Sequence, residues 1–166
     1  SEVFRVYISP DVLGIELGAA LKNVVALAAG IADGLGYGDN TKAALITRGL
    51  AEMARLGIAL GADEYTFAGL TGIGDLVVTC TSQHSRNNRF GNLVGKGTPV
   101  KEALETVGTV EGYYAVEIAE CLAEKYSVDL PIITQCYNIL FNNSPAEEAI
   151  RNLMTRPGKP EEESIW

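Results

Sequence analysis

The stretch LGAALKNVVALAAGIADGLGYGDN, residues 17–40, contains the most apolar segment of the chain and the glycine-rich loop that ends it. Small and apolar side chains surround two polar ones, Lys22 and Asn23. Asp11 upstream is a typical N-cap, and the glycines downstream are typical of helix ends. The sequence therefore predicts one long helix over 11–34, and a lysine inside so apolar a helix needs an explanation.

Most of the remaining chain also has the pattern of helices. Leucines and a methionine recur at helical spacing over 40–60, where Asp39 or Asn40 would act as the cap. The segment from Ser144 to Glu147 has the form of a capping box. Residues 77–79 would suit a strand as well as a helix. The expected helices are 40–60, 76–81, 85–93, 99–106, 111–126, 131–141 and 144–154.

The sequence VFRVYIS, residues 3–9, alternates apolar and polar side chains as a β-strand does. No later segment would pair with it, so this strand would stand alone before a helical chain. We therefore predict an all-α fold, a single multi-helix bundle domain over 11–155. Residues 1–10 would be a remnant strand and linker of a missing domain, and residues 156–166 a polar, disordered tail.

Charge and cysteine content argue against several function classes. The formal net charge is -8 and the basic residues form no long run, so no nucleic-acid partner is expected. Cys80, Cys121 and Cys136 have no CxxC spacing and there is one histidine, which predicts reduced core cysteines and no metal site. The chain start lacks a signal-peptide core, and residues 24–31 are too short to span a bilayer. We expect a soluble, cytoplasmic protein without a membrane span.

Lys22 has two explanations. Gly18, Ala19, Val25 and Ala26 lie three and four residues away on the helix, and mostly small side chains there would leave a groove beside the ammonium group. Burial lowers the pKa of a lysine and suits it to proton transfer near neutral pH. Alternatively, the side chain extends from the helix edge into water.

Two further segments carry candidate polar groups. Asp75 stands between glycines and an apolar run, where it would either cap a helix or orient Lys22 and bind a substrate hydroxyl. Ser85 has the position of a helix cap, yet Arg86 and Arg89 follow in the first turn, where the helix dipole disfavours cations. An anion bound between the arginines and the free backbone N–H groups would explain them. A pair of solvated surface arginines is the alternative.

Taken together, these segments resemble the NAD(P)-dependent glycerol-3-phosphate dehydrogenase family. GAALKNVVALAAGIADGLGYGDN, NTKAALITRGLAEMARLG, GIGDLVVTCTS, SRNNRFG and VEG follow in the family's order, and the resemblance covers residues 4–154. Ala19 departs from the pattern, because the family usually has glycine beside the lysine. The resemblance implies the helical C-terminal domain of the bacterial-type enzyme, with a fold like the C-terminal domain of 6-phosphogluconate dehydrogenase.

The resemblance also implies roles for individual residues. Lys22 matches the family's proton-transfer lysine, which acts on the C2 hydroxyl of glycerol 3-phosphate or the carbonyl of dihydroxyacetone phosphate. Asp75 matches the aspartate beside it in the site. Substrate binding is implied for Lys22, Asn23, Asp75, Thr79, Ser85, Arg86 and Asn87. Cofactor binding is implied for Arg86, Thr109 and Glu111, with NAD or NADP held mainly by an N-terminal Rossmann domain.

The family's GxGxxG loop between a strand and a helix has no counterpart in this sequence. We therefore expect the chain to act on glycerol 3-phosphate and dihydroxyacetone phosphate only with its own N-terminal Rossmann domain, and to be inactive alone. The resemblance also implies a homodimer. Two alternatives stay open: a non-catalytic helical module for dimerisation or binding, and a domain of a related hydroxyacid dehydrogenase.

Overall fold

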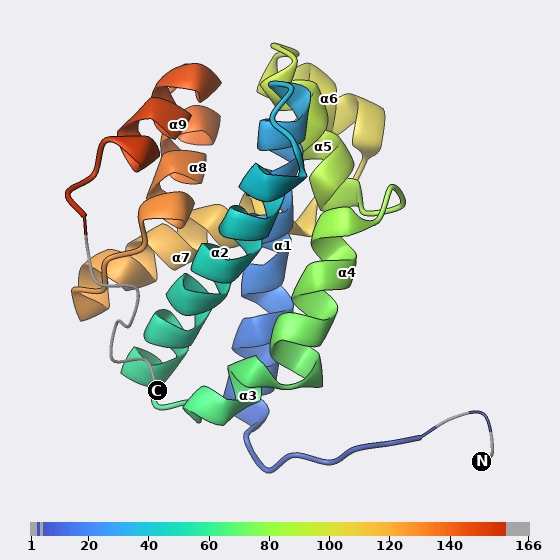
Figure 1. Cartoon of the computed structure of the whole chain (residues 1–166), viewed down its shortest axis with the longest axis vertical. Helices are drawn as coiled ribbons and strands as arrows, with labels where there is room; N and C mark the ends of the chain where they lie inside the picture. The colour runs from blue at the N-terminus through green and yellow to red at the C-terminus, as the bar shows by residue number, and fades with distance from the viewer. Residues whose placement is uncertain (1–2, 4, 159–166) are drawn as a thin grey trace.

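The computed structural model describes residues 3 and 5–158. Within them the chain folds into a bundle of nine α-helices and one π-helical segment, without a strand, so the all-α prediction is confirmed (Figure 1). The elements are α1 (Val12–Gly34), α2 (Asp39–Leu60), α3 (Glu64–Ala68), η1 (Leu70–Gly74), α4 (Asp75–Thr81), α5 (Arg86–Gly95), α6 (Val100–Val107), α7 (Glu111–Tyr126), α8 (Pro131–Phe141) and α9 (Ala146–Met154).

The central element is α1, which contacts α2, α4, α5, α7 and α8. Every residue from Asn23 to Ala32 is buried. Among the described residues α1 is the one helix long and apolar enough to cross a membrane, but 56% of its apolar window is buried inside the bundle. Its composition is therefore that of a core helix, and burial by neighbouring helices explains its long apolar run.

Glycines let α1 and α5 approach each other closely. A Cβ atom added to Gly30 would lie 2.1 Å from the backbone oxygen of Asn88, and one added to Gly91 would lie 2.1 Å from that of Leu27. No side chain fits at either position, because backbone faces backbone. This contact fixes α5 along the C-terminal half of α1.

The predicted helix limits agree with the structure to within two residues, but two predicted caps are wrong. Asp11 caps α1 as expected, and its Oδ1 accepts a hydrogen bond from Gly14 N at 2.9 Å. Neither α2 nor α9 has a side-chain cap. Asp39 is itself the first residue of α2, after Gly38. The backbone N–H of Ser144 instead donates to Asn138 at the end of α8.

No strand forms at the chain start within the described residues, and the alternative of a strand at 77–79 is wrong. Residues 5–9 have no regular secondary structure, are exposed and run away from the bundle (Figure 1). A strand needs a neighbour to receive its backbone hydrogen bonds, and the described part of the chain provides none. Residues 77–79 belong to α4. Residues 159–166 of the predicted tail lie outside the described residues, whereas Arg156 forms an ion pair with Asp129.

The cysteines are free thiols in different surroundings. Cys80 and Cys136 are buried as expected, and burial raises the pKa of Cys80 to about 12 and also raises that of Cys136. The core prediction is wrong for Cys121, which is exposed. Because α7 buries Ala119 and Ala123, the residue midway between them points to the opposite side of the helix.

Candidate active site

Lys22 and Asp75 meet across the bundle, although 53 residues separate them. Nζ of Lys22 forms an ion pair with Oδ2 of Asp75, and their side chains are 19% and 35% exposed. The pair therefore lies at an opening of the bundle that solvent can reach. The capping alternative for Asp75 is wrong, because α4 has no side-chain cap bond and the carboxylate faces the lysine.

A π-helical segment places Asp75 at this opening. η1 leads directly into α4, whose first residue is Asp75. π-Helical turns occur often at functional sites, and a carboxylate in the first turn of a helix is favoured by the helix dipole. Oγ1 of Thr79, one turn later, lies 3.2 Å from Oδ1 and 2.7 Å from the backbone oxygen of Asp75. One carboxylate oxygen thus faces the lysine while the other faces a hydroxyl.

A buried amide network starts at the residue after the lysine. Asn23 and Asn87 are both 6% exposed. Nδ2 of Asn87 donates to Oδ1 of Asn23 at 2.9 Å, and its Oδ1 accepts from Gly112 N at 2.8 Å. Nδ2 of Asn23 donates to Oε2 of Glu111 at 3.3 Å. The two amides therefore tie the N-termini of α5 and α7 to α1, next to Lys22.

The first turn of α5 carries the predicted anion-binding residues. Oγ of Ser85 caps the helix by accepting from Asn88 N at 3.3 Å. Nη2 of Arg86 lies 3.4 Å from Oε1 of Glu111, and the two side chains are 50% and 60% exposed. Thr109 is exposed just before α7, and Arg89 is exposed on α5. Arg86 thus already contacts one anionic group, which partly explains a cation at this helix end.

The arrangement links an ammonium group to a cluster of polar groups at the N-termini of α5 and α7. Lys22 supplies an ammonium group that a carboxylate orients, and the exposed Ala19 and Ala20 leave the helix surface beside it open. Arg86 and the N-termini of α5 and α7 are suited to a phosphate or another anion. Chemically, the opening could bind a small phosphorylated compound and exchange a proton with it.

Glu52 is a buried charged residue that the sequence analysis missed. It is 1% exposed on α2, and its carboxylate accepts from Ile132 N at 2.8 Å and Ile133 N at 3.2 Å at the start of α8. Burial raises the pKa of Glu52 to about 7, despite these hydrogen bonds. Its spacing from the buried Gly49 and Leu56 was the available sign that it faces the core.

Comparisons with known proteins identify the family of this chain. The family model described as "NAD-dependent glycerol-3-phosphate dehydrogenase C-terminus" matches residues 11–151. The glycerol-3-phosphate dehydrogenase [NAD(P)+] of Agathobacter rectalis is 59% identical over 166 residues, which cover 99% of this chain and 49% of that protein. The enzyme of the same name from Bacillus cereus is 58% identical, over 98% of this chain and 48% of its own.

A solved structure gives the same result for the fold. The crystal structure of glycerol-3-phosphate dehydrogenase from Coxiella burnetii matches with a TM-score of 0.89 and 44% identity, over 92% of this chain and 47% of that one. The chain spans about half the length of the curated relatives it matches. It belongs to the NAD-dependent glycerol-3-phosphate dehydrogenase family, in which it corresponds to the C-terminal part.

Proposed function

We propose that this chain is the substrate-binding and catalytic half of an oxidoreductase that interconverts sn-glycerol 3-phosphate and dihydroxyacetone phosphate with NAD(P)(H). The observation that carries the proposal is the ion pair between Lys22 and Asp75 at an opening of the bundle. Family membership supports it, because relatives twice as long bear the name of this activity.

Lys22 is the proton-transfer group of the proposed reaction. In the direction of reduction, its ammonium group donates a proton to the C2 carbonyl oxygen of dihydroxyacetone phosphate, and in oxidation the neutral amine accepts the proton of the C2 hydroxyl. Asp75 holds the ammonium group in place, and Thr79 steadies the carboxylate from its other side. Both directions need a proton carrier at this oxygen, because the alcohol and the carbonyl differ by one proton there.

The substrate phosphate binds at the first turn of α5 in this proposal. Arg86 offers a guanidinium group with several donors, and Ser85 stands at the same helix end. Asn23 and Asn87 each use amide atoms within the bundle, so we assign them a positioning role alongside substrate contact. A phosphate at Arg86 would compete with Glu111 for the guanidinium group.

The chain offers the edge of a cofactor site. NAD(P)H supplies the hydride for the carbonyl carbon when it is bound. Arg86, Thr109 and Glu111 are the residues that would border it, since the exposed guanidinium and carboxylate suit the polar groups of a dinucleotide. Residues 5–158 contain no strand, hence no strand–loop–helix unit that could bind the pyrophosphate. The remaining contacts must come from a nucleotide-binding domain.

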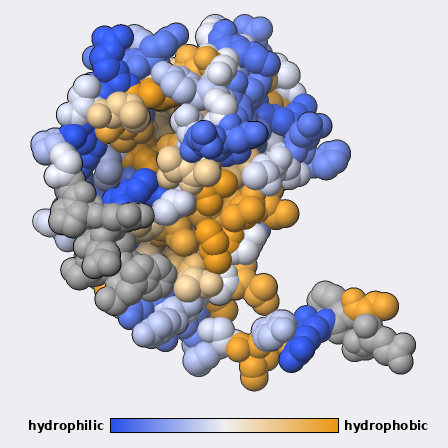
Figure 2. Space-filling model, viewed as in Figure 1, coloured by the Kyte–Doolittle hydropathy of each residue, from blue (hydrophilic) through white to orange (hydrophobic). Residues whose placement is uncertain are grey.

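An exposed apolar surface supports a domain partner of this kind. Val12, Leu70 and Val78, from α1, η1 and α4, are each more than half exposed. Figure 2 shows hydrophobic side chains gathered over α4, on the elements that carry Lys22 and Asp75. Large exposed apolar patches mark interaction sites. A Rossmann domain seated there would close the site, and the resemblance further suggests a homodimer.

The test is turnover by the full-length protein that carries this chain. Dihydroxyacetone phosphate should be reduced with oxidation of NADH or NADPH, and Lys22→Ala should lower kcat by about 10²–10⁴-fold. Lys42→Ala is the matched control, because Lys42 is similarly exposed and forms an ion pair with Asp33 at 3.0 Å. It should change kcat less than about twofold.

Two results would contradict the proposal in different ways. If Lys22→Ala keeps the activity of the Lys42→Ala control, the lysine is not the proton-transfer group. If the unchanged protein does not act on either substrate, the activity itself is wrong. Turnover by the 166-residue chain alone would refute its dependence on a nucleotide-binding domain.

A further inference from the structure

A cleft of about 440 Å³ lies between α2, the start of α8 and the end of α9, and no residue assigned above to the active site lines it. Its volume falls within the range of small-molecule sites. Side chains from the three helices form apolar walls, among them Leu45, Ile132 and Leu153. The cleft is therefore a separate candidate for ligand binding.

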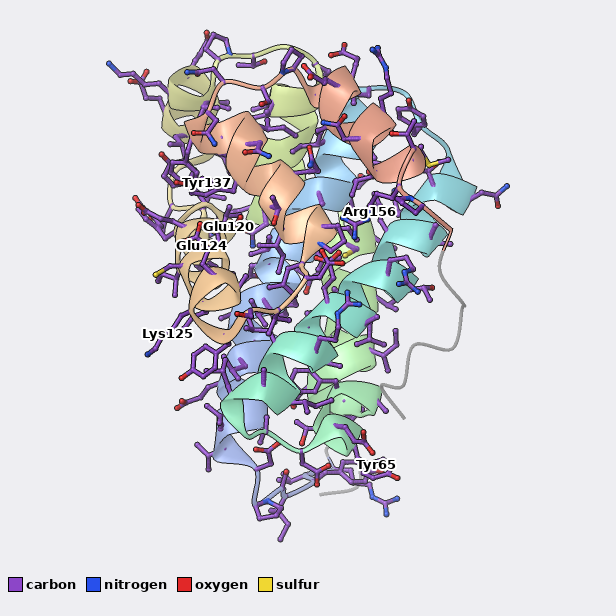
Figure 3. The ribbon with its side chains drawn as sticks, turned by 90° about the vertical axis from the view of Figure 1, so that its left-hand side faces the viewer. Tyr65, Glu120, Glu124, Lys125, Tyr137 and Arg156 are labelled. Atoms are coloured by element: carbon purple, nitrogen blue, oxygen red, sulfur yellow. The ribbon has the colours of Figure 1, made fainter. Side chains whose placement is uncertain are left out.

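Guanidinium groups gather at this cleft. Arg48, Arg55 and Arg156 line it together with the carboxyl groups of Glu52 and Asp129. Glu52 is bound to the backbone of α8, and Asp129 lies 2.6 Å from Nη2 of Arg156. Figure 3 shows Arg156 between the end of α9 and α2. Among the described residues that line the cleft, arginines outnumber acids, which favours an anionic ligand.

The arginines already interact with other groups, so a ligand must either add to these interactions or replace one of the present partners. Arg48, Arg55 and Asp129 each have polar or electrostatic interactions of their own, and Arg156 has Asp129. Arginine is suited to such exchange, because its planar group offers five donors to carboxylate or phosphate oxygens. An anion placed here would keep hydrogen bonds satisfied while it replaces another acceptor.

Packing behind the apolar wall is incomplete. A cavity of about 30 Å³ shares Leu45, Ile132 and Leu153 with the cleft and is also lined by Gln135. Within the described residues, Oε1 of Gln135 is buried without a hydrogen-bond partner. Unfilled space beside an unsatisfied acceptor is uncommon in protein interiors. The wall thus has room to adjust to an apolar group pressed against it.

We propose that this cleft binds a small amphiphilic anion. Its carboxylate or phosphate head lies against Arg48 and Arg156, and its apolar body lies along Leu45, Ile132 and Leu153. A wholly polar anion would leave the apolar walls in contact with water, and a neutral apolar compound would not use the guanidinium groups. The combination of the two surfaces defines the ligand class.

Calorimetric titration of the full-length protein with octanoate and monooctyl phosphate tests this site. Each should bind with a dissociation constant below about 1 mM. Inorganic phosphate, which lacks the apolar body, and 1-octanol, which lacks the anionic head, should each bind at least tenfold more weakly. The stronger of the two amphiphiles identifies the head group that the arginines prefer.

Two variants and two controls locate the binding. Arg48→Gln and Met154→Gln change exposed residues that line the cleft, so the fold should persist and the affinity should fall at least about fivefold. Arg151→Gln changes an exposed arginine of α9 that does not line the cleft, and Arg86→Gln changes the proposed substrate site. Neither should alter the affinity for octanoate, which carries no phosphate.

Three outcomes would overturn the proposal. One is equal binding of inorganic phosphate, and another is unchanged affinity in both cleft variants. The third is binding that occurs only after the chain is shortened to end at Gly158. In that case residues 159–166 would compete with the ligand for the cleft. Retained dehydrogenase activity in Lys22→Ala would contradict the proposed function and would change none of these binding results, so the two proposals fail independently.

Discussion

Lys22 and Glu52 each place an ionisable group on a long helix of the core, yet they meet different partners. Lys22 on α1 pairs with the side chain of Asp75, and both remain partly exposed. Glu52 on α2 accepts hydrogen bonds from the backbone of α8 and is sealed from solvent. One group can exchange a proton with a ligand at the surface, whereas the other can only hold two helices together.

The difference in partners distinguishes the proposed catalytic charge from a structural one in this bundle. A side-chain partner can give way when substrate arrives, because rotation about its bonds releases the ion pair. The backbone N–H groups at the start of α8 cannot move without disrupting the helix. We therefore expect changes at the Lys22 pair to affect turnover, and changes at Glu52 to affect stability.

After the loss of Lys22 itself, the largest effect is expected from Asp75→Asn in the full-length protein. The amide keeps the shape of the carboxylate but removes the charge that holds the ammonium group of Lys22. Steady-state assays with dihydroxyacetone phosphate should show kcat reduced by about 10²-fold or more, with the midpoint of urea unfolding nearly unchanged. If stability falls together with activity, the ion pair is structural and does not differ from Glu52 in its role.

Glu52→Ala should lower stability and leave kcat nearly unchanged, which is the opposite of Asp75→Asn. It leaves the N–H groups of Ile132 and Ile133 without their acceptor and opens a cavity between α2 and α8. The free energy of unfolding should fall by about 3 kcal/mol, measured with urea near pH 6. The kcat of the remaining folded protein should stay within about twofold of the unchanged enzyme. A large drop in kcat would place Glu52 in the catalytic machinery.

The pH dependence of the free energy of unfolding also tests the structural role of Glu52. Burial raises the pKa of Glu52 from 4.5 to about 7, so the folded state keeps a proton that the unfolded chain releases. This contribution to stability is fully present below pH 4.5 and is lost as the pH rises through 7. Between pH 5 and pH 7 the free energy of unfolding should fall by about 2 kcal/mol relative to Glu52→Gln. A parallel pH dependence in that variant would assign the effect to other groups.

Lys22 and Glu52 also differ in how far the sequence alone could reveal them. Lys22 is conspicuous because nearly all its neighbours on α1 are apolar, and the Asp11 cap with the downstream glycines predicted that helix to within one residue at its start. Periodicity could not bring Asp75 to it, since they meet only in tertiary structure. The resemblance supplied that pairing, as it supplied the grouping of Asn23 with Asn87 that the hydrogen bonds now connect.

The sequence around Glu52 does not single it out as a buried acid. α2 carries several charged residues, so one more acid does not stand out, and its partners are backbone N–H groups of α8 that no side-chain pattern reveals. The cap at Ser144 failed for a related reason, because its backbone was already bonded to the end of α8. Backbone-mediated contacts between distant helices are the part of this fold that local patterns do not predict.

The smallest effect is expected from Thr79→Val, which removes the hydroxyl beside Asp75 and keeps the side-chain shape. Oγ1 of Thr79 has one hydrogen to share between the carboxylate and the backbone oxygen of Asp75, so Lys22 remains the stronger partner of the carboxylate. We expect kcat to fall about threefold to tenfold, in line with one ordinary hydrogen bond of about 1 kcal/mol. Thr81→Val is the matched control, since its hydroxyl donates only to the backbone oxygen of Val77 one turn earlier. Equal losses in both variants would reduce Thr79 to a helix-packing residue, whereas a loss confined to Thr79→Val extends the site from the ion pair to the second turn of α4.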